Sequence, residues 1–144
     1  VRVRMIGRRT NIPDQVLAEL DHTVAMSRTN DGMWLNLAIN YGGRAEMVDA
    51  VRRIAREVQS GKLAPEEITE STLAGQLYTA GMPDPDLLIR TSGELRLSNF
   101  LLWQLAYAEL YVTPVLWPDF TRRDFFEAVL EFQRRDRRFG RVPI

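Results

Sequence analysis

A short apolar run that ends in an arginine is the feature that most constrains this chain. Leu87 to Ile89 is apolar, is bounded by Pro85 and Gly93, and leads directly into Arg90. This pattern predicts a buried strand of an α/β sheet, and ligands of such sheets gather beyond the carboxyl ends of the strands. We therefore expect Arg90 at a place where such a protein binds its ligand.

The residues after Arg90 have the chemistry of an anion site. Ser98 is expected to cap a helix over residues 99–107, and the N–H groups and dipole at a helix N-terminus favour negative charge. Arg90 and Arg96 can each bind a phosphate through two parallel N–H donors. A diphosphate would satisfy these donors.

The same residue types also permit a purely structural interpretation. Arg90 and Arg96 could pair with Glu94 and Asp86 and form a cluster of ion pairs that binds no ligand. The residue types alone do not separate the two interpretations.

Four segments of the chain resemble a known family. They read R-T-S-G-E-L-R-L-S-N-F-L-L-W-Q-L-A-Y-A-E-L-Y at 90–111, L-W-P-D-F at 116–120, R-R-F-G at 137–140 and L-N-L-A-I-N-Y-G-G-R at 35–44. Together they resemble the signature of the cis-prenyltransferases, specifically the bacterial undecaprenyl diphosphate synthases. The resemblance covers nearly all of the chain.

The resemblance implies an α/β fold, a mainly parallel β-sheet flanked by helices, that lacks its N-terminal strands and helices. Residues 1–144 are expected to form the C-terminal portion of a single cis-prenyltransferase domain. The family's D-G-N-G-R-W type segment, which holds the allylic diphosphate and supplies the catalytic aspartate, has no match here, because 31–34 reads D-G-M-W. Residues 1–7 alternate as a strand does, so the chain is expected to open inside a sheet element. Because the segment that supplies the catalytic aspartate has no match, no catalytic residue is expected in this chain.

The resemblance also assigns roles to particular residues. Arg90, Arg96 and Ser98 would bind the diphosphate of isopentenyl diphosphate, Glu94 would orient one arginine, and Asn99 would cap or orient the loop. In the family, an Arg-x-Gly near the C-terminus reaches the diphosphate pocket of the other subunit of a dimer. The residues of this chain that match it are Arg138 and Gly140.

Glu109 matches a glutamate that the family associates with magnesium, so Mg²⁺ is the expected cofactor and Glu109 its expected ligand here. Carboxylate and phosphate oxygens are the ligands that Mg²⁺ prefers. A continuous helix would separate Ser98 and Glu109 by about 16 Å, which is too far for both to touch one diphosphate. Glu109 could instead face a subunit interface or support the site indirectly.

The implied function is prenyl transfer in isoprenoid biosynthesis, in which isopentenyl diphosphate condenses with an allylic diphosphate to form a polyprenyl diphosphate. The implied assembly is a homodimer, and the lipid product would bring it near a membrane surface. This chain alone is expected to be inactive. Two alternatives remain: a non-catalytic subunit, or a diphosphate-binding module that partners a catalytic chain.

Composition narrows the functional classes to which the chain can belong. The formal net charge is +0, which argues against nucleic-acid binding driven by total charge, and the chain has no cysteine for disulfides or thiolate metal sites. No apolar run approaches the roughly 18 residues that span a bilayer, so a cytoplasmic location is the default expectation.

Apolar periodicity predicts the other elements. We expect a helix at 13–27, a strand at 34–40, a helix after Gly42-Gly43-Arg44, a strand at 111–116 and a last helix from about Thr121. The Gly-Gly pair is either a tight turn or part of a substrate-binding wall. In the helix after Gly43, the apolar residues Met47, Val48, Val51, Ala55 and Val58 fall at helical spacing. The helix from Thr121 is expected to bury Phe125, Phe126, Val129 and Leu130.

Overall fold

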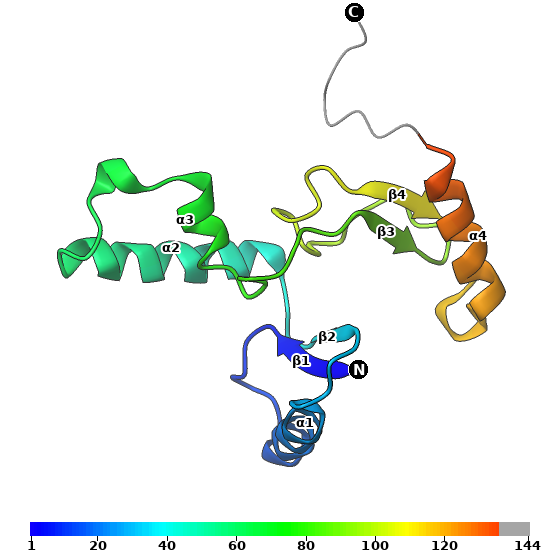
Figure 1. Ribbon diagram of the computed structural model, residues 1–144, viewed down its shortest axis with the longest axis horizontal. Coiled ribbons are helices and arrows are strands. Elements are labelled where there is room, and N and C mark those ends of the chain that lie inside the picture. The colour runs from blue at the N-terminus through cyan, green and yellow to red at the C-terminus, as the bar shows by residue number, and fades with distance from the viewer. Residues whose placement is uncertain (136–144) are drawn as a thin grey trace, which may run out of the picture. The chain divides into compact units, whose positions relative to one another are not determined.

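The computed structural model describes residues 1–135, which form parts of two compact units (Figure 1). Unit 1 spans Val1–Met82 and unit 2 spans Pro83–Ile144. Arg138 and Gly140 lie outside the described residues.

Unit 1 begins with a strand, a helix and a second strand parallel to the first. The elements of this unit are β1 (Arg2–Ile6), α1 (Asp14–Ser27), β2 (Trp34–Ala38), α2 (Gly43–Gln59), the 3₁₀ turn η1 (Pro65–Glu67) and α3 (Glu70–Ala74). The register pairs Arg2 with Trp34 and Ile6 with Ala38. Parallel strands need a crossover, and α1 provides it. The parallel α/β arrangement predicted from the sequence is confirmed in this unit.

The buried face of α2 does not coincide with its apolar residues at helical spacing. Glu46, Ala50 and Ile54 are buried at helical spacing, whereas Val48 and Val51 are 47% and 57% exposed. Of the other residues at that spacing, Ala55 is also exposed, and Met47 and Val58 are half-buried. Hydrophobicity alone does not identify the buried face, because a glutamate takes one of its positions.

Unit 2 contains a second pair of parallel strands and a terminal helix. Its elements among the described residues are β3 (Leu87–Arg90), β4 (Glu109–Val112), the 3₁₀ turn η2 (Trp117–Asp119) and α4 (Arg122–Gln133). The register pairs Leu87 with Glu109 and Arg90 with Val112. The strand predicted at 111–116 is thus shifted toward the N-terminus, and Pro114 lies beyond its end.

The helix predicted at 99–107 is absent, and this segment forms a series of turns instead. Ser98, Asn99 and Leu101 have φ angles of 50°, 62° and 42°, which lie in the left-handed region and cannot continue a right-handed helix. Ser98 therefore caps no helix. The 16 Å separation expected along a continuous helix between Ser98 and Glu109 does not apply.

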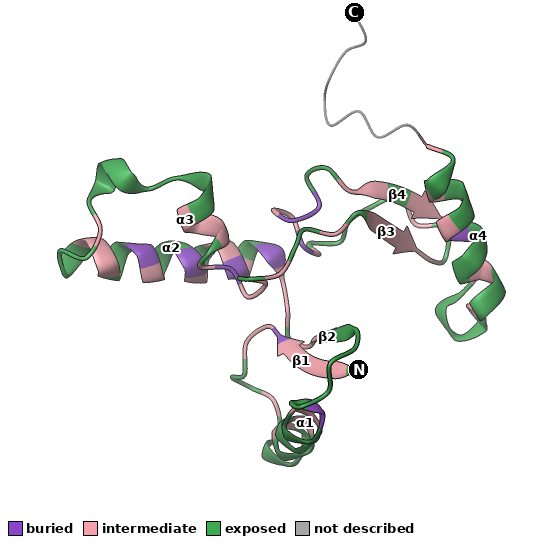
Figure 2. Ribbon diagram, viewed as in Figure 1, coloured by how far each residue is buried: buried purple, intermediate pink, exposed green. Residues whose placement is uncertain are grey.

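The last helix is placed as predicted, but it buries few of its apolar side chains. Thr121 precedes α4, and its backbone N–H donates to the Asp124 carboxylate at 2.7 Å. Phe125, Phe126 and Leu130 are 46–55% exposed, and only Ala128 of the helix is buried (Figure 2). The predicted burial of these side chains was wrong, because the described part of unit 2 offers little apolar surface to cover them.

Candidate anion-binding site

The loop after β3 is held against the segment after β4 by backbone hydrogen bonds. The N–H of Thr113 donates to the Arg90 carbonyl at 2.9 Å, and that of Gly93 donates to the Thr113 carbonyl at 2.8 Å. The N–H of Ser92 donates to the Val115 carbonyl at 2.9 Å. The loop is therefore an ordered extension of the strand pair at its carboxyl end, where sheets of this class bind ligands.

Arg90 is the last residue of β3, and its guanidinium has unused donors. Its Nη2 donates to Ser98 Oγ at 3.3 Å. Its Nε is buried and has no hydrogen-bond partner among residues 1–135, where no carboxylate forms an ion pair with Arg90 either. A cation without a counter-ion and a buried donor without an acceptor both cost free energy, about 1–3 kcal/mol for the donor. An anionic ligand would supply what is missing.

Arg96 behaves differently. Its Nη1 forms an ion pair with the Glu94 carboxylate, and the two side chains are 66% and 36% exposed. The structural interpretation, in which both arginines pair with neighbouring carboxylates, thus describes Arg96 but not Arg90. Glu94 lies where the sequence placed it, beside one of the arginines.

Left-handed backbone conformations are concentrated in this loop. Ser92, Gly93, Ser98, Asn99 and Leu101 all have φ between 42° and 65°. Such conformations cost side-chain-bearing residues about 1–3 kcal/mol, and in proteins they gather at ligand-binding and catalytic sites. The loop is shaped by its surroundings against local preference, as expected for a binding loop.

Glu109 does not lie with the loop residues. It is the first residue of β4 and is paired in register with Leu87, three residues before Arg90. At about 3.3 Å per residue, Glu109 is about 10 Å along the strands from the carboxyl end. Its Oε2 accepts a hydrogen bond from Arg135 Nη1 at 2.9 Å. The structure therefore groups Arg90, Glu94, Arg96, Ser98 and Asn99 in one loop and places Glu109 elsewhere.

A second polar cluster, in unit 1, was not found from the sequence. Asp49 accepts two hydrogen bonds from Arg8, from Nε at 2.7 Å and Nη2 at 2.8 Å, and one from the Tyr78 hydroxyl at 2.6 Å. The buried Glu46 accepts from the Tyr41 hydroxyl at 2.5 Å and from the Tyr78 N–H at 2.7 Å. The cluster links the ends of β1 and β2, the first turns of α2 and the segment after α3.

The electrostatics of this cluster follow from those bonds. The Arg8 guanidinium and then the Tyr78 hydroxyl hold the pKa of the Asp49 carboxyl well below its usual range. The hydrogen bonds to Asp49 raise the pKa of Arg8, and burial raises the pKa of Tyr78. Two carboxylates three residues apart on α2 were the available signal, since Glu46 and Asp49 share a helix face with Arg53.

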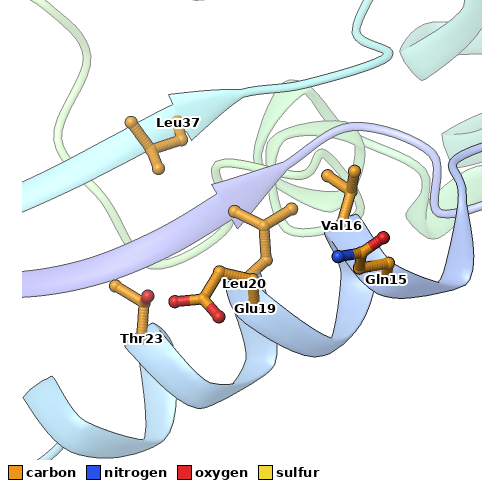
Figure 3. A pocket seen from close by; sticks show the side chains of 6 residues that line it. All are labelled: Gln15, Val16, Glu19, Leu20, Thr23 and Leu37. Carbon is orange, nitrogen blue, oxygen red and sulfur yellow. The ribbon is translucent and has the colours of Figure 1, made fainter.

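Neither a metal centre nor a membrane span is found among the described residues. No three side chains of the His, Cys, Asp and Glu types converge there. None of the helices within residues 1–135 is long and apolar enough to cross a bilayer. An apolar hollow between α1 and β2 has Val16, Leu20 and Leu37 on its walls and a polar rim that includes Gln15 and Glu19 (Figure 3). It carries no cationic side chain, so it does not suit a diphosphate.

Known proteins resemble this chain over nearly all of its length. A family model described as "Putative undecaprenyl diphosphate synthase" matches residues 1–140. An isoprenyl transferase of Geobacillus kaustophilus is 55% identical over 142 residues, covering 99% of this chain and 55% of the relative. One from Heliobacterium mobile is 53% identical over 144 residues, with 100% and 55% covered.

Two solved structures are also similar. Lavandulyl diphosphate synthase from Lavandula x intermedia, in complex with dimethylallyl diphosphate, has a TM-score of 0.95 and 42% identity, covering 97% of this chain and 60% of that one. A probable undecaprenyl diphosphate synthase from Campylobacter jejuni has a TM-score of 0.81 and 37% identity, with 97% and 63% covered.

The chain belongs to the undecaprenyl diphosphate synthase family of prenyltransferases. The recognition made from the sequence motifs and the α/β fold class are both confirmed. The chain spans about 55% of the length of the curated relatives above.

Proposed function

We propose that this chain is a portion of a cis-prenyltransferase domain and supplies the binding site for the diphosphate of isopentenyl diphosphate. The observation that carries the proposal is Arg90, whose guanidinium lies at the carboxyl end of β3 and has no counter-ion among residues 1–135. Its neighbours in the loop lie in the segment at 90–111 that resembles the family signature. The reaction of the whole enzyme would be cis-prenyl chain elongation.

In that reaction the carbon–oxygen bond of the allylic diphosphate breaks and pyrophosphate leaves. The alkene of isopentenyl diphosphate forms the new carbon–carbon bond, and a proton is lost from it. Arg90, Arg96 and Ser98 would hold the isopentenyl diphosphate so that its alkene faces the allylic carbon. Their contribution is positioning and neutralisation of charge.

Glu94 would orient Arg96, since the two side chains already form an ion pair. Asn99 would fix the loop through its left-handed backbone, for which Asn is better suited than most residues. To bind a diphosphate, the Arg96 guanidinium would have to contact both the diphosphate and the Glu94 carboxylate, or release the carboxylate. Arg90 requires no such exchange.

Mg²⁺ is the cofactor expected from the resemblance, with Glu109 as its ligand, but the described residues do not form a magnesium site by themselves. Glu109 is bound to a guanidinium, and it belongs to no group of three potential metal-ligating side chains within residues 1–135. Mg²⁺ needs a nearly octahedral set of oxygens. We therefore assign this chain no step that depends on the ion.

The remaining proposals rest on the resemblance. The complete enzyme would be a cytoplasmic homodimer in which Arg138 and Gly140 reach the site of the other subunit, and its lipid product would bring it near a membrane. We expect negligible turnover from this chain alone, because no residue of it matches the catalytic aspartate segment. The exposed apolar side chains of α4 and β2 support a chain that is covered by further protein.

The test is calorimetric titration of isopentenyl diphosphate into the 144-residue chain. We compare wild type with Arg90→Ala and, as a matched control, with Arg123→Ala, which removes an exposed arginine of the same unit. Arg90→Ala is expected to weaken binding about 100-fold, because it removes several charge-assisted hydrogen bonds. The control is expected to bind as wild type does.

Three outcomes would contradict this site. These are equal binding by wild type and Arg90→Ala, equal weakening in both variants, and no binding by a folded wild-type chain. Turnover of isopentenyl and allylic diphosphates by the purified chain alone would refute the proposed dependence on further protein. Magnesium-independent binding of isopentenyl diphosphate without turnover would favour a diphosphate-binding module. Co-purification with a chain that carries the missing segment would instead favour a non-catalytic subunit.

A further inference from the structure

Arg135 joins three groups on two elements of unit 2. Its Nη1 donates to Glu109 Oε2 at 2.9 Å and to the Leu110 carbonyl at 3.0 Å. Its Nη2 donates to Glu131 Oε1 at 2.5 Å. One guanidinium therefore connects the start of β4 with the last turn of α4, across 26 positions of sequence.

This arrangement gives the Glu109 carboxylate a different partner from a metal ion. The Arg135 guanidinium stays protonated at any pH that the protein meets, so it is a permanent cation at the carboxylate. Both side chains are only 30% exposed, which reduces screening by solvent. Two carboxylates neutralise the guanidinium, and first Glu131 and then Glu109 raise the pKa of Arg135.

The position of Glu109 in the sheet points the same way. It lies at the amino end of β4, whereas the anion-binding loop lies at the carboxyl end of β3, about 10 Å along the strands. An ion that bridged Glu109 and a diphosphate held by Arg90 would have to span that separation. The geometry within this chain does not provide for it.

We propose that Glu109 and Arg135 form a clamp that fixes the end of α4 to the start of β4. In this chain the Glu109 carboxylate binds Arg135 and does not bind a metal ion. The clamp compensates for weak packing, since Phe125, Phe126 and Leu130 of α4 remain largely exposed. Arg135 is in this view a positioning residue. The inference does not depend on the proposed transferase activity.

The test is a double-mutant cycle on the 144-residue chain with Glu109→Gln, Arg135→Gln and the double variant. The measured quantity is protection of the α4 and β4 amides against hydrogen exchange. The matched control is the Arg123–Glu127 pair, an i,i+4 pair on the same helix with side chains 87% and 54% exposed. Its variants are Arg123→Gln, Glu127→Gln and their double.

Each clamp variant is expected to lower protection of α4 and β4 by about tenfold, because the partner left behind is partly desolvated. The double clamp variant should lose no more than the worse single variant. The control variants should each change protection by less than about twofold. Additive losses at Glu109 and Arg135, or losses no larger than those of the control, would overturn the clamp.

The metal interpretation is tested on the same samples by adding Mg²⁺. The clamp predicts that Mg²⁺ leaves the protection of β4 unchanged in wild type and in all variants. Protection that Mg²⁺ raises in wild type but not in Glu109→Gln would overturn the proposal. So would tighter Mg²⁺ binding in Arg135→Gln, since it would show that the guanidinium merely competes with the ion.

Discussion

The polar cluster of unit 1 and the arginine loop of unit 2 use the same residue types in opposite ways. In unit 1, Arg8 faces Asp49 with two hydrogen bonds, and the Tyr78 hydroxyl donates to the same carboxylate. In unit 2, Arg90 donates only to a hydroxyl, at 3.3 Å, and its buried Nε has no partner among the described residues. One arginine is neutralised by the fold, and the other is not.

This difference separates residues that hold elements together from residues that await a ligand. A buried polar group that is fully paired rigidifies its surroundings, whereas an unpaired one costs free energy that a bound ligand would offset. The backbone shows the same contrast, because Ser92, Ser98, Asn99 and Leu101 adopt left-handed conformations in the arginine loop. In unit 1, two non-glycine residues have left-handed backbone conformations, Asn11 and Asn40.

The largest expected effect comes from breaking the unit 1 cluster at its buried carboxylate. Glu46→Ala leaves the Tyr41 hydroxyl and the Tyr78 N–H without their acceptor and opens a cavity, so the free energy of unfolding should fall by roughly 3 kcal/mol. Hydrogen exchange of the α2 amides measures it. A loss below about 1 kcal/mol would mean that the cluster does not hold unit 1 together.

The next effect is pH-dependent and concerns Asp49. The pKa of Asp49 is lower in the folded chain than in the unfolded one. Its stabilising contribution is therefore complete above the ordinary aspartate pKa of 3.8 and is lost as pH falls further through the folded pKa. Asp49→Asn should cost about 2 kcal/mol at neutral pH. The difference from wild type should shrink in acid.

Urea unfolding of both proteins at neutral and acidic pH measures this difference. Asp124→Asn is the comparison, because hydrogen bonds from Thr121 also lower the pKa of Asp124, but at the exposed start of α4. A gap between Asp49→Asn and wild type that is constant with pH would contradict the ionised role of Asp49.

A smaller effect of opposite sign is expected in the arginine loop. Ser92 is exposed with φ of 65°, a conformation that glycine adopts without strain, so Ser92→Gly should stabilise unit 2 by about 0.5–1 kcal/mol. Thermal unfolding measures the gain. A destabilised variant would show that the Ser92 side chain, and not backbone strain, determines the loop.

The smallest effect sharpens the comparison most. Arg90→Met should not lower the free energy of unfolding, because no carboxylate among residues 1–135 loses a partner and the buried Nε donor without an acceptor is removed. Urea unfolding without ligand measures it, with Arg8→Met as the contrasting variant that removes two hydrogen bonds to Asp49. Equal destabilisation by the two variants would erase the distinction between the two regions.

Local patterns in the sequence predicted much of this molecule. The apolar run before Arg90, the alternation at 1–7 and 34–40 and the proline before α1 identified strands and a helix that the structure contains. The motif at 90–111 identified the family. These features depend on neighbours within a few residues, which a sequence displays directly.

Other predictions failed where distant contacts override local preference. The apolar segment at 99–107 was expected to be helical, but the residues at its beginning have left-handed backbone conformations, which exclude an α-helix there. The side of α2 that is buried is decided by Glu46, whose carboxylate accepts the N–H of Tyr78, 32 positions away. Propensity and periodicity do not report such partners.

By itself, the sequence determined the family, the parallel α/β class and the loop in which the candidate site lies. Only the tertiary structure decided that Arg96 is paired while Arg90 is not, and that Glu109 binds Arg135. The physical reason is the sequence separation of the contacts. Residues 90–99 are neighbours in sequence, so their grouping is local. The ionic partner of Glu109 lies 26 residues away and is set by the packing of a helix beside a strand.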